Sequence, residues 1–293
     1  MTTEPRPGTL SDGENCNAAS PDAQREKTTQ TTQDEQTEYP PWLATYVTWF
    51  RSWTDSFITG NATDDRYVRL KRDHTLRVLD NARLIVATLA LPPETERAAL
   101  LAALLHDVGR FPQYALYRTF SDQLSENHGL LGCRTVLRED LLTEECPALR
   151  GQVLAAVAMH NRFRVPLGIS SSLRIITDVV RDSDKLDIFP VMVSTFTRDA
   201  SDNDVVTLHL EDKPGAWSAP MVEALRTGSL ARYSEMRYIN DFKLLLGSWV
   251  FDLQFAASRR LLRERGLLEL LLATWPLHPD LDALKHSVRQ ALE

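Results

Sequence analysis

The sequence predicts an all-α fold, and two observations favour that class. Apolar residues recur at steps of three and four through most of the chain after residue 40. Breaks in this pattern coincide with residues that end helices, as at Pro92-Pro93. A pattern typical of a strand and turn occurs at 204–220, where we expect a short β-hairpin. Apolar residues make up 43% of the chain, which is enough to bury a sizeable core.

The first 39 residues differ in composition from the rest of the chain. They are rich in Thr, Gln, Glu, Asp, Ser and Pro and contain almost no large apolar side chain. Such a segment buries too little surface to offset the entropy lost on ordering. We therefore predict a disordered tail over residues 1–39 and one helical domain over residues 40–293, since no second linker of comparable length follows.

Helical patterns can be assigned in order along this domain. An aromatic stripe from Trp42 to Phe57 predicts a first helix whose rings pack in the core. A second helix is marked by apolar residues from Val78 to Leu89, with His74 one turn earlier on the same face. Residues 98–105 mark a third helix, and Gly109 stands where a left-handed C-terminal cap would end it.

The later patterns are also helical, apart from the expected hairpin. Ser125 could cap a helix that runs to Leu137. Another helix ends near His160, and the next leads from Leu173 to Asp184. From Met221 to the C-terminus the pattern is helical again and completes the core.

Charge and cysteine content restrict the classes of function. The formal net charge of -7 disfavours a duplex nucleic acid as partner, because phosphate binding needs a basic surface. The three cysteines show no zinc-motif spacing and favour reduced thiols. No apolar run is long enough to cross a bilayer. We expect a cytoplasmic protein with no membrane partner, and the sequence leaves its oligomeric state open.

Candidate metal ligands gather in the middle of the chain. His106 and Asp107 are adjacent at the end of a strongly apolar helix, where an unpaired charge would be costly. A divalent cation would explain the pair, although a simple hydrogen-bonded pair at a helix end remains an alternative. His74, His128 and His160 each lie on or at the end of an apolar helix face, as expected for further ligands.

Asp184 completes this set of six. It lies in a run of three acids and two cations, Arg181 to Asp187, which could also form a solvated face. However, Ile176 and Val180 indicate that the helix has a buried side, and Asp184 lies one turn beyond Val180 on that side. We therefore treat Asp184 as a candidate ligand.

The ordered set resembles the HD-domain superfamily of metal-dependent phosphohydrolases. More narrowly, the chain is similar to a bacterial group of HD-domain proteins that mostly lack assigned substrates, from about residue 66 to about 255. The residues that carry this closer resemblance are His106-Asp107-Val108-Gly109-Arg110-Phe111-Pro112-Gln113-Tyr114, Thr119-Phe120-Ser121-Asp122, Ser125-Glu126-Asn127-His128, and His160-Asn161 followed by Pro166. The resemblance implies a compact HD-domain helical bundle.

The resemblance also implies roles for the six residues. One metal would be bound by the residues His74, His106, Asp107 and Asp184. A second would be held by His128 and His160, with the Asp107 carboxylate bridging the two ions. We therefore expect two divalent transition-metal ions, and the ligand types do not distinguish manganese, iron, cobalt, nickel or zinc. The Gly-Tyr-Pro signature of the cyclic-dinucleotide phosphodiesterase branch is absent from the sequence.

The expected reaction is hydrolysis of a small phosphorylated substrate, such as a nucleotide, by a metal-activated water. Catalytic roles are expected for Asp107, Arg110 and Lys185, the two cations holding phosphate charge. Arg110 and Lys185 would thus also bind substrate, together with Gln113 and Asn161, and Asp122 could orient an imidazole. Specificity would lie in segments 111–124, 161–170 and 200–220.

Two alternatives remain open at this point. A branch of the same superfamily uses a six-ligand dinuclear iron site for oxygenation, and the ligand order here is compatible with it. The domain could also be a regulatory module that binds a nucleotide without catalysis. Iron content with oxygen uptake would favour the oxygenase, whereas tight metal binding without turnover would favour the module.

Overall fold

The computed structural model describes residues 39–197, 208 and 210–293, and its regular secondary structure in these ranges is helical, with loops between the helices. The helices are α1 Pro41–Asp55, α2 Ala62–Val86, α3 Pro93–Leu105, α4 Arg110–Tyr117, α5 His128–Arg138, α6 Pro147–Met159, α7 Ser171–Thr197, α8 Ala219–Arg226, η2 Tyr233–Glu235, α9 Ile239–Ser248, η3 Trp249–Asp252, α10 Ala256–Glu264, α11 Leu267–Ala273 and α12 Pro279–Leu292. The prediction of an all-α fold is confirmed. The tail 1–38 lies outside the described residues.

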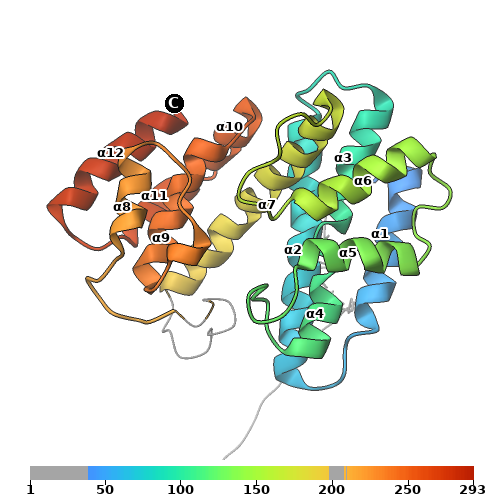
Figure 1. Ribbon diagram of the computed structural model, residues 1–293, viewed down its shortest axis with the longest axis horizontal. Helices are drawn as coiled ribbons and strands as arrows, with labels where there is room; N and C mark the ends of the chain where they lie inside the picture. Colours follow the sequence, from blue (N-terminus) through green and yellow to red (C-terminus); the bar gives the residue numbers. More distant parts are fainter. Residues whose placement is uncertain (1–38, 198–207, 209) are drawn as a thin grey trace, which may run out of the picture. The chain divides into compact units, whose positions relative to one another are not determined.

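Helices α2, α3 and α7 form the centre of the fold, and each packs against the other two (Figure 1). Local sequence sets where these helices begin: Asn61 caps α2 by accepting from the backbone N–H groups of Thr63 and Asp64. Pro93 opens α3, because the first turn of a helix does not need its N–H group. Almost the whole of α3 from Ala98 to Leu105 is buried, so its C-terminal end reaches the interior.

Helix α7 connects the N-terminal helices with the C-terminal helices. It contacts α2, α3 and α6, and also α10 and α11. Pro190 lies inside α7, in its C-terminal half. One hydrophobic core includes residues from Leu43 in α1 to Leu292 in α12. Because α7 takes part in both halves, the C-terminal helices help to fix its position.

Three local expectations need correction. The described part of 204–220 does not form the expected hairpin. In it, Glu211 makes an isolated parallel bridge with Tyr238. Residues 204–207 and 209 lie outside the described residues. Helix α5 begins at His128, and its cap is Asn127, two residues after the expected Ser125, since the Asn127 side chain accepts from Leu130 N–H. Gly109 has a right-handed conformation (φ −66°), so it is no left-handed cap.

The segment 111–124, expected as a loop, is half helical. Residues up to Tyr117 belong to α4, and the left-handed Arg118 (φ 56°) ends that helix. The loop 118–127 follows and leads directly into α5. Specificity residues expected in this segment therefore lie on a helix end and a short loop.

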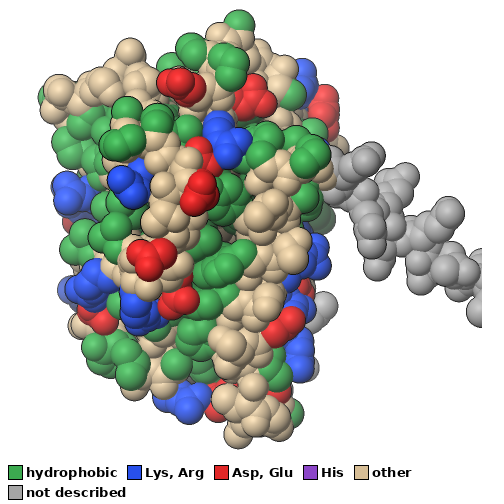
Figure 2. Space-filling view, turned by 90° about the vertical axis from the view of Figure 1, so that its right-hand side faces the viewer, with side chains coloured by type: hydrophobic (Ala, Val, Ile, Leu, Met, Phe, Trp, Pro, Cys, Tyr) green, Lys and Arg blue, Asp and Glu red, His purple; other side chains and the backbone are tan. Residues whose placement is uncertain are grey.

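No described helix is long and apolar enough to cross a membrane. Cys133 and Cys146 are free thiols, and Cys16 lies outside the described residues. On the face in Figure 2, hydrophobic and charged side chains are interspersed, and no histidine side chain is seen on it. The histidines of interest are instead buried in the interior.

Candidate metal centre

The structure brings the six candidate ligands into one cluster. The ligand-bearing positions come from α2 (His74), the turn after α3 (His106 and Asp107), the start of α5 (His128), the end of α6 (His160) and the middle of α7 (Asp184). All except Asp184 are buried. The Asp184 side chain keeps 23% of its surface exposed, so it marks the side from which solvent reaches the cluster.

The cluster divides into two groups of three ligand atoms. In the first group, Asp184 Oδ1 lies 3.1 Å from His74 Nε2 and 3.8 Å from His106 Nε2. In the second group, Asp107 Oδ1 lies 3.4 Å from His128 Nε2 and 3.9 Å from His160 Nε2. Each group offers two imidazole nitrogens and one carboxylate oxygen, a set that suits a divalent transition metal.

Asp107 lies between the two groups. While its Oδ1 faces the second group, its Oδ2 lies 3.6 Å from His74 Nε2 and 3.7 Å from His106 Nε2. One oxygen is therefore directed towards each group, which is the placement that a bridging carboxylate needs.

Each imidazole is held through its Nδ1 atom by an oxygen acceptor. His74 Nδ1 lies 2.7 Å from Asp187 Oδ2, and His128 Nδ1 lies 2.8 Å from both oxygens of Asp122. Backbone carbonyls of the same helices hold His106 and His160, at 2.8 and 2.7 Å. Such contacts place the proton on Nδ1 and leave Nε2 as a lone-pair donor towards the centre.

The Nε2 atoms provide the test of whether a cation fits. His74 Nε2 and His106 Nε2 are buried without a hydrogen-bond partner, although buried polar atoms are nearly always satisfied. His128 Nε2 and His160 Nε2 lie 3.0 Å apart, so their lone pairs would repel each other when both Nδ1 atoms carry the protons. Cations between these atoms would remove both penalties, so the residues fit a metal centre.

The electrostatics keep most of these ligands in the state that binds a metal. Burial lowers the pKa of His106 and His128, and it lowers the pKa of His160 to about 3, so these imidazoles stay neutral. For Asp107, burial would raise the pKa, but the positive charges of Lys71 and Arg110, with the neighbouring imidazoles, outweigh it and hold the pKa well below its usual range.

His74 differs from the other three imidazoles. Burial and the Lys71 charge lower its pKa, but hydrogen bonds to Asp184 and Asp187 outweigh them and raise it. The pKa of Asp184 is lowered, because the His74 hydrogen bond and the two nearby imidazoles, His106 and His74, outweigh burial. His74 is thus the ligand for which protons and a metal compete most.

Of the two cations expected to bind phosphate, one lies at the centre. Arg110 Nε is 3.5 Å from Asp107 Oδ1. Lys185 does not lie at the centre, because its Nζ donates to Asp252 Oδ2 at 2.5 Å. Neighbouring residues of a helix point about 100° apart. Since Asp184 points towards the centre, Lys185 points away from it. The charge expected from Lys185 is supplied instead by Lys71, whose Nζ donates to Asp107 Oδ2 at 2.8 Å.

The two amides expected to bind substrate have different surroundings. Gln113 is fully buried and its Nε2 donates to Asp122, Ser125 and the Glu126 carbonyl, so it fixes the loop before α5. Asn161 Nδ2 donates to Asp122 Oδ2 at 3.1 Å, while its buried Oδ1 has no partner. Both side chains therefore support Asp122, the acceptor for His128.

Sequence reasoning missed three residues at the site. Lys71 precedes His74 by three residues, and Asp187 follows Asp184 by three, so helical spacing from a ligand was a usable signal for both. Tyr233 of η2 gave no such signal. The pKa of its hydroxyl is raised by burial and by the Asp184 charge and lowered by Arg110.

The charged run around Asp184 is largely buried, contrary to the solvated-face alternative. Arg181 and Lys185 both donate to Asp252 of η3, and Asp182 accepts from the backbone N–H groups of Gln254 and Phe255. These contacts fix α7, and with it Asp184, against the η3–α10 segment.

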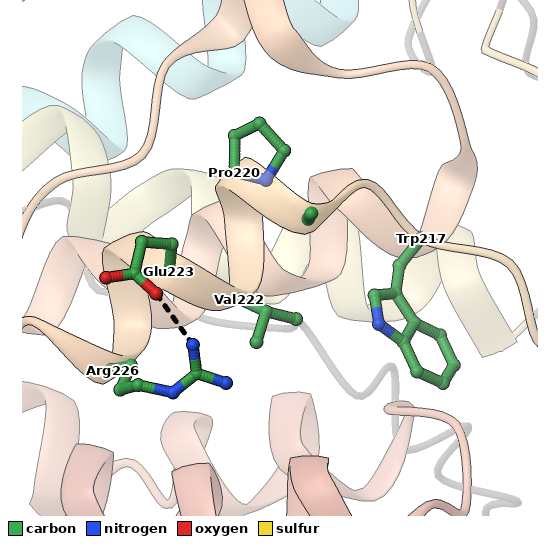
Figure 3. A pocket seen from close by; sticks show the side chains of 6 residues that line it. Trp217, Pro220, Val222, Glu223 and Arg226 are labelled. Carbon is green, nitrogen blue, oxygen red and sulfur yellow. Dashed lines mark hydrogen bonds and ion pairs between the residues drawn. The ribbon is translucent and has the colours of Figure 1, made fainter.

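Another hollow in the structure is separate from this cluster. It lies along α8 and is lined by Trp217, Pro220, Val222 and the ion pair Glu223–Arg226 (Figure 3). None of its lining residues is a candidate ligand, so it adds nothing to the centre.

The family comparison agrees with this geometry. The family model described as HD domain matches residues 72–187. The match supports the assignment of residues 72–187 to the HD-domain superfamily. HD domains form a metal-dependent family of the hydrolase type, and the matched range contains all six candidate ligands. Helices α8–α12 lie outside the match. No curated protein and no solved structure matches the chain significantly.

Proposed function

We propose that this HD-domain protein is a phosphohydrolase that uses two divalent metal ions to cleave a phosphomonoester or phosphodiester of a small substrate, such as a nucleotide. The observation that carries the proposal is the inward direction of four imidazole Nε2 atoms around a central carboxylate, with two cations beside it. Imidazoles and carboxylates would hold the metals, and the cations would hold an anion next to them.

Each group of residues would have its own role in the reaction. Bound metal ions supply an activated water and neutralise charge on phosphate oxygens. Asp107, held ionised by its cationic neighbours, would serve as the shared ligand. Asp187 and Asp122 would keep the His74 and His128 rings in the orientation that ligation needs. Burial of the imidazoles would keep bulk water from competing for the ligand positions.

The two cations favour hydrolysis over the oxygenase alternative. Lys71 and Arg110 each approach one oxygen of Asp107, so positive charge lies on both sides of the shared ligand. Such a pair suits a phosphate, which carries more than one negative charge and several acceptor oxygens. The six ligands themselves suit iron as well as manganese, so ligand type does not decide between the reactions.

A turnover panel tests the proposal. The full-length protein, loaded with Mn²⁺ or Co²⁺, is assayed for phosphate release from phosphomonoesters and for cleavage of phosphodiesters. We expect turnover with at least one ester, and a loss of more than about 100-fold in His106→Ala and Asp184→Ala. His286→Ala is the matched control, because His286 is an exposed histidine on α12.

Two outcomes would overturn the proposal. One is hydrolysis that persists in His106→Ala, since the activity would then not depend on the centre. The other is oxygen consumption by the iron-loaded protein with a substrate, together with no turnover of any ester in the panel. This result would assign the oxygenase reaction instead.

A further inference from the structure

We propose that Lys71, together with the Nε–H group of Arg110, forms the site that binds a phosphate group of the substrate beside the metal centre. The inference rests on the proposed phosphohydrolase function and deepens it by naming the anion-binding residue. Lys71 lies outside every motif from which function was read in the sequence, and its role follows from its position.

Lys71 reaches the centre from α2, one turn before His74. Its Nζ lies 2.8 Å from Asp107 Oδ2, on the opposite carboxylate oxygen from Arg110. An ammonium group has three N–H donors, and Asp107 takes one of them. The other donors of Lys71 are therefore available to an anion that approaches the carboxylate.

Arg110 presents one free donor at the same place. Its Nη1 is fully engaged with Gln113 Oε1, Asp122 Oδ1 and the Phe120 carbonyl, which fixes the guanidinium plane. Its Nε–H group is buried and has no hydrogen-bond partner. A buried donor without a partner is costly, and a phosphate oxygen would satisfy it.

The two cations share an aromatic support. The Phe120 ring lies 5.4 Å from Lys71 Nζ and 6.0 Å from Arg110 Cζ, within the range of cation–π attraction. Phe120 itself is nearly buried against Tyr67 and Tyr114. The cations are thus held on a rigid platform, which preserves their spacing when an anion binds.

Lys71 is also accessible. Its side chain is 19% exposed, whereas the four imidazoles are buried, so a substrate can reach it from solvent. A lysine suits this position because its ammonium sits on a flexible stem and can follow an incoming phosphate. The buried Lys185, bonded to Asp252, cannot do the same.

The test is binding of inorganic phosphate to the Mn²⁺-loaded full-length protein by titration calorimetry, which needs no turnover. Lys71→Met is expected to weaken phosphate binding by about 10- to 100-fold, the usual effect of losing a charged hydrogen bond. Arg72→Met is the matched control: it removes the same charge from the next residue of α2, whose guanidinium pairs with Asp55 and Asp73. It should change the affinity by less than about 2-fold, because exposed charges are screened.

Mn²⁺ affinity and thermal unfolding of the same variants complete the test. Lys71→Met is expected to bind Mn²⁺ at least as tightly as the wild type, since a positive charge beside Asp107 is removed, and to unfold at a similar temperature. Equal phosphate affinity in Lys71→Met and wild type would overturn the inference. So would loss of Mn²⁺ binding in Lys71→Met, which would make Lys71 a support of the metal ligands. Failure of the turnover panel would count against the proposed function without changing the phosphate titration.

Discussion

Replacing Gly109 by alanine should open the contact between the Asp107 turn and α5. A Cβ atom at position 109 would lie 2.1 Å from the His128 carbonyl oxygen and 2.6 Å from Gly132 N. Both are backbone atoms, so no side-chain rotation can relieve the clash. The two segments must separate by about 1 Å, and such overpacking costs about 1–3 kcal/mol. His128 would then move away from Asp107.

Two measurements check this prediction. In Gly109→Ala, the unfolding temperature should fall by about 2–10 °C, the shift that this free energy implies for a domain of this size. Bound metal should fall from two ions per chain to one, because His74, His106 and Asp184 do not lie on α5. Gly151→Ala is the control: Gly151 lies in α6 with no atom near its Cβ position, so alanine should raise helix stability by about 0.5–1 kcal/mol. A Gly109→Ala protein that keeps wild-type stability and both ions would refute the reasoning.

Three further predictions follow from the same contacts. Asp187→Asn weakens the acceptor that orients His74, so metal affinity should fall by about 10- to 100-fold in competition with a chelator; unchanged affinity would show that the ring is fixed by packing. Hydrogen bonds from Arg97 lower the pKa of Glu145 below its value in the unfolded chain. The Arg97–Glu145 pair therefore stabilises the folded state fully above about pH 4.3. This stabilisation is lost as the pH falls through the lowered pKa of Glu145. Glu145→Gln should therefore lower the free energy of unfolding by about 2 kcal/mol at pH 7, and by less in acid. A difference from the wild type that does not change with pH would contradict this prediction. Removal of metal by a chelator should lower the unfolding temperature and re-addition should restore it, because cations bind only the folded centre; identical melting with and without metal would argue against a built site.

The sequence predicted the site best at positions where a possible metal ligand lies on the apolar face of a helix. His106 and Asp107 close an apolar helix, and that helix is buried along almost its whole second half, so its end had to reach the interior. His74 and Asp184 could be assigned by the apolar residues one turn away on the same face. Long amphipathic helices carry this information because one face must be buried.

Other features depend on contacts between distant segments and could not be read from the sequence. The direction of Lys185 is set by Asp252, which lies 67 residues later. Gly109 has the sequence context of a helix cap, but position 109 needs a glycine because α5 approaches its backbone closely. Tyr233 reaches the electrostatic field of the centre from the C-terminal half. Local propensity does not encode such partners, whereas spacing of three residues from a known ligand would have identified Lys71 and Asp187.

Anomalous diffraction from crystals of the Mn²⁺-loaded full-length protein is the most direct test of the central claim, that these six side chains bind metal. We predict two peaks, one within about 2.0–2.3 Å of ligand atoms from His74, His106 and Asp184, and one equally close to His128 and His160. Asp107 should contact both. An absence of anomalous density next to Asp107 in metal-loaded crystals would contradict the assignment of this cluster as a metal centre.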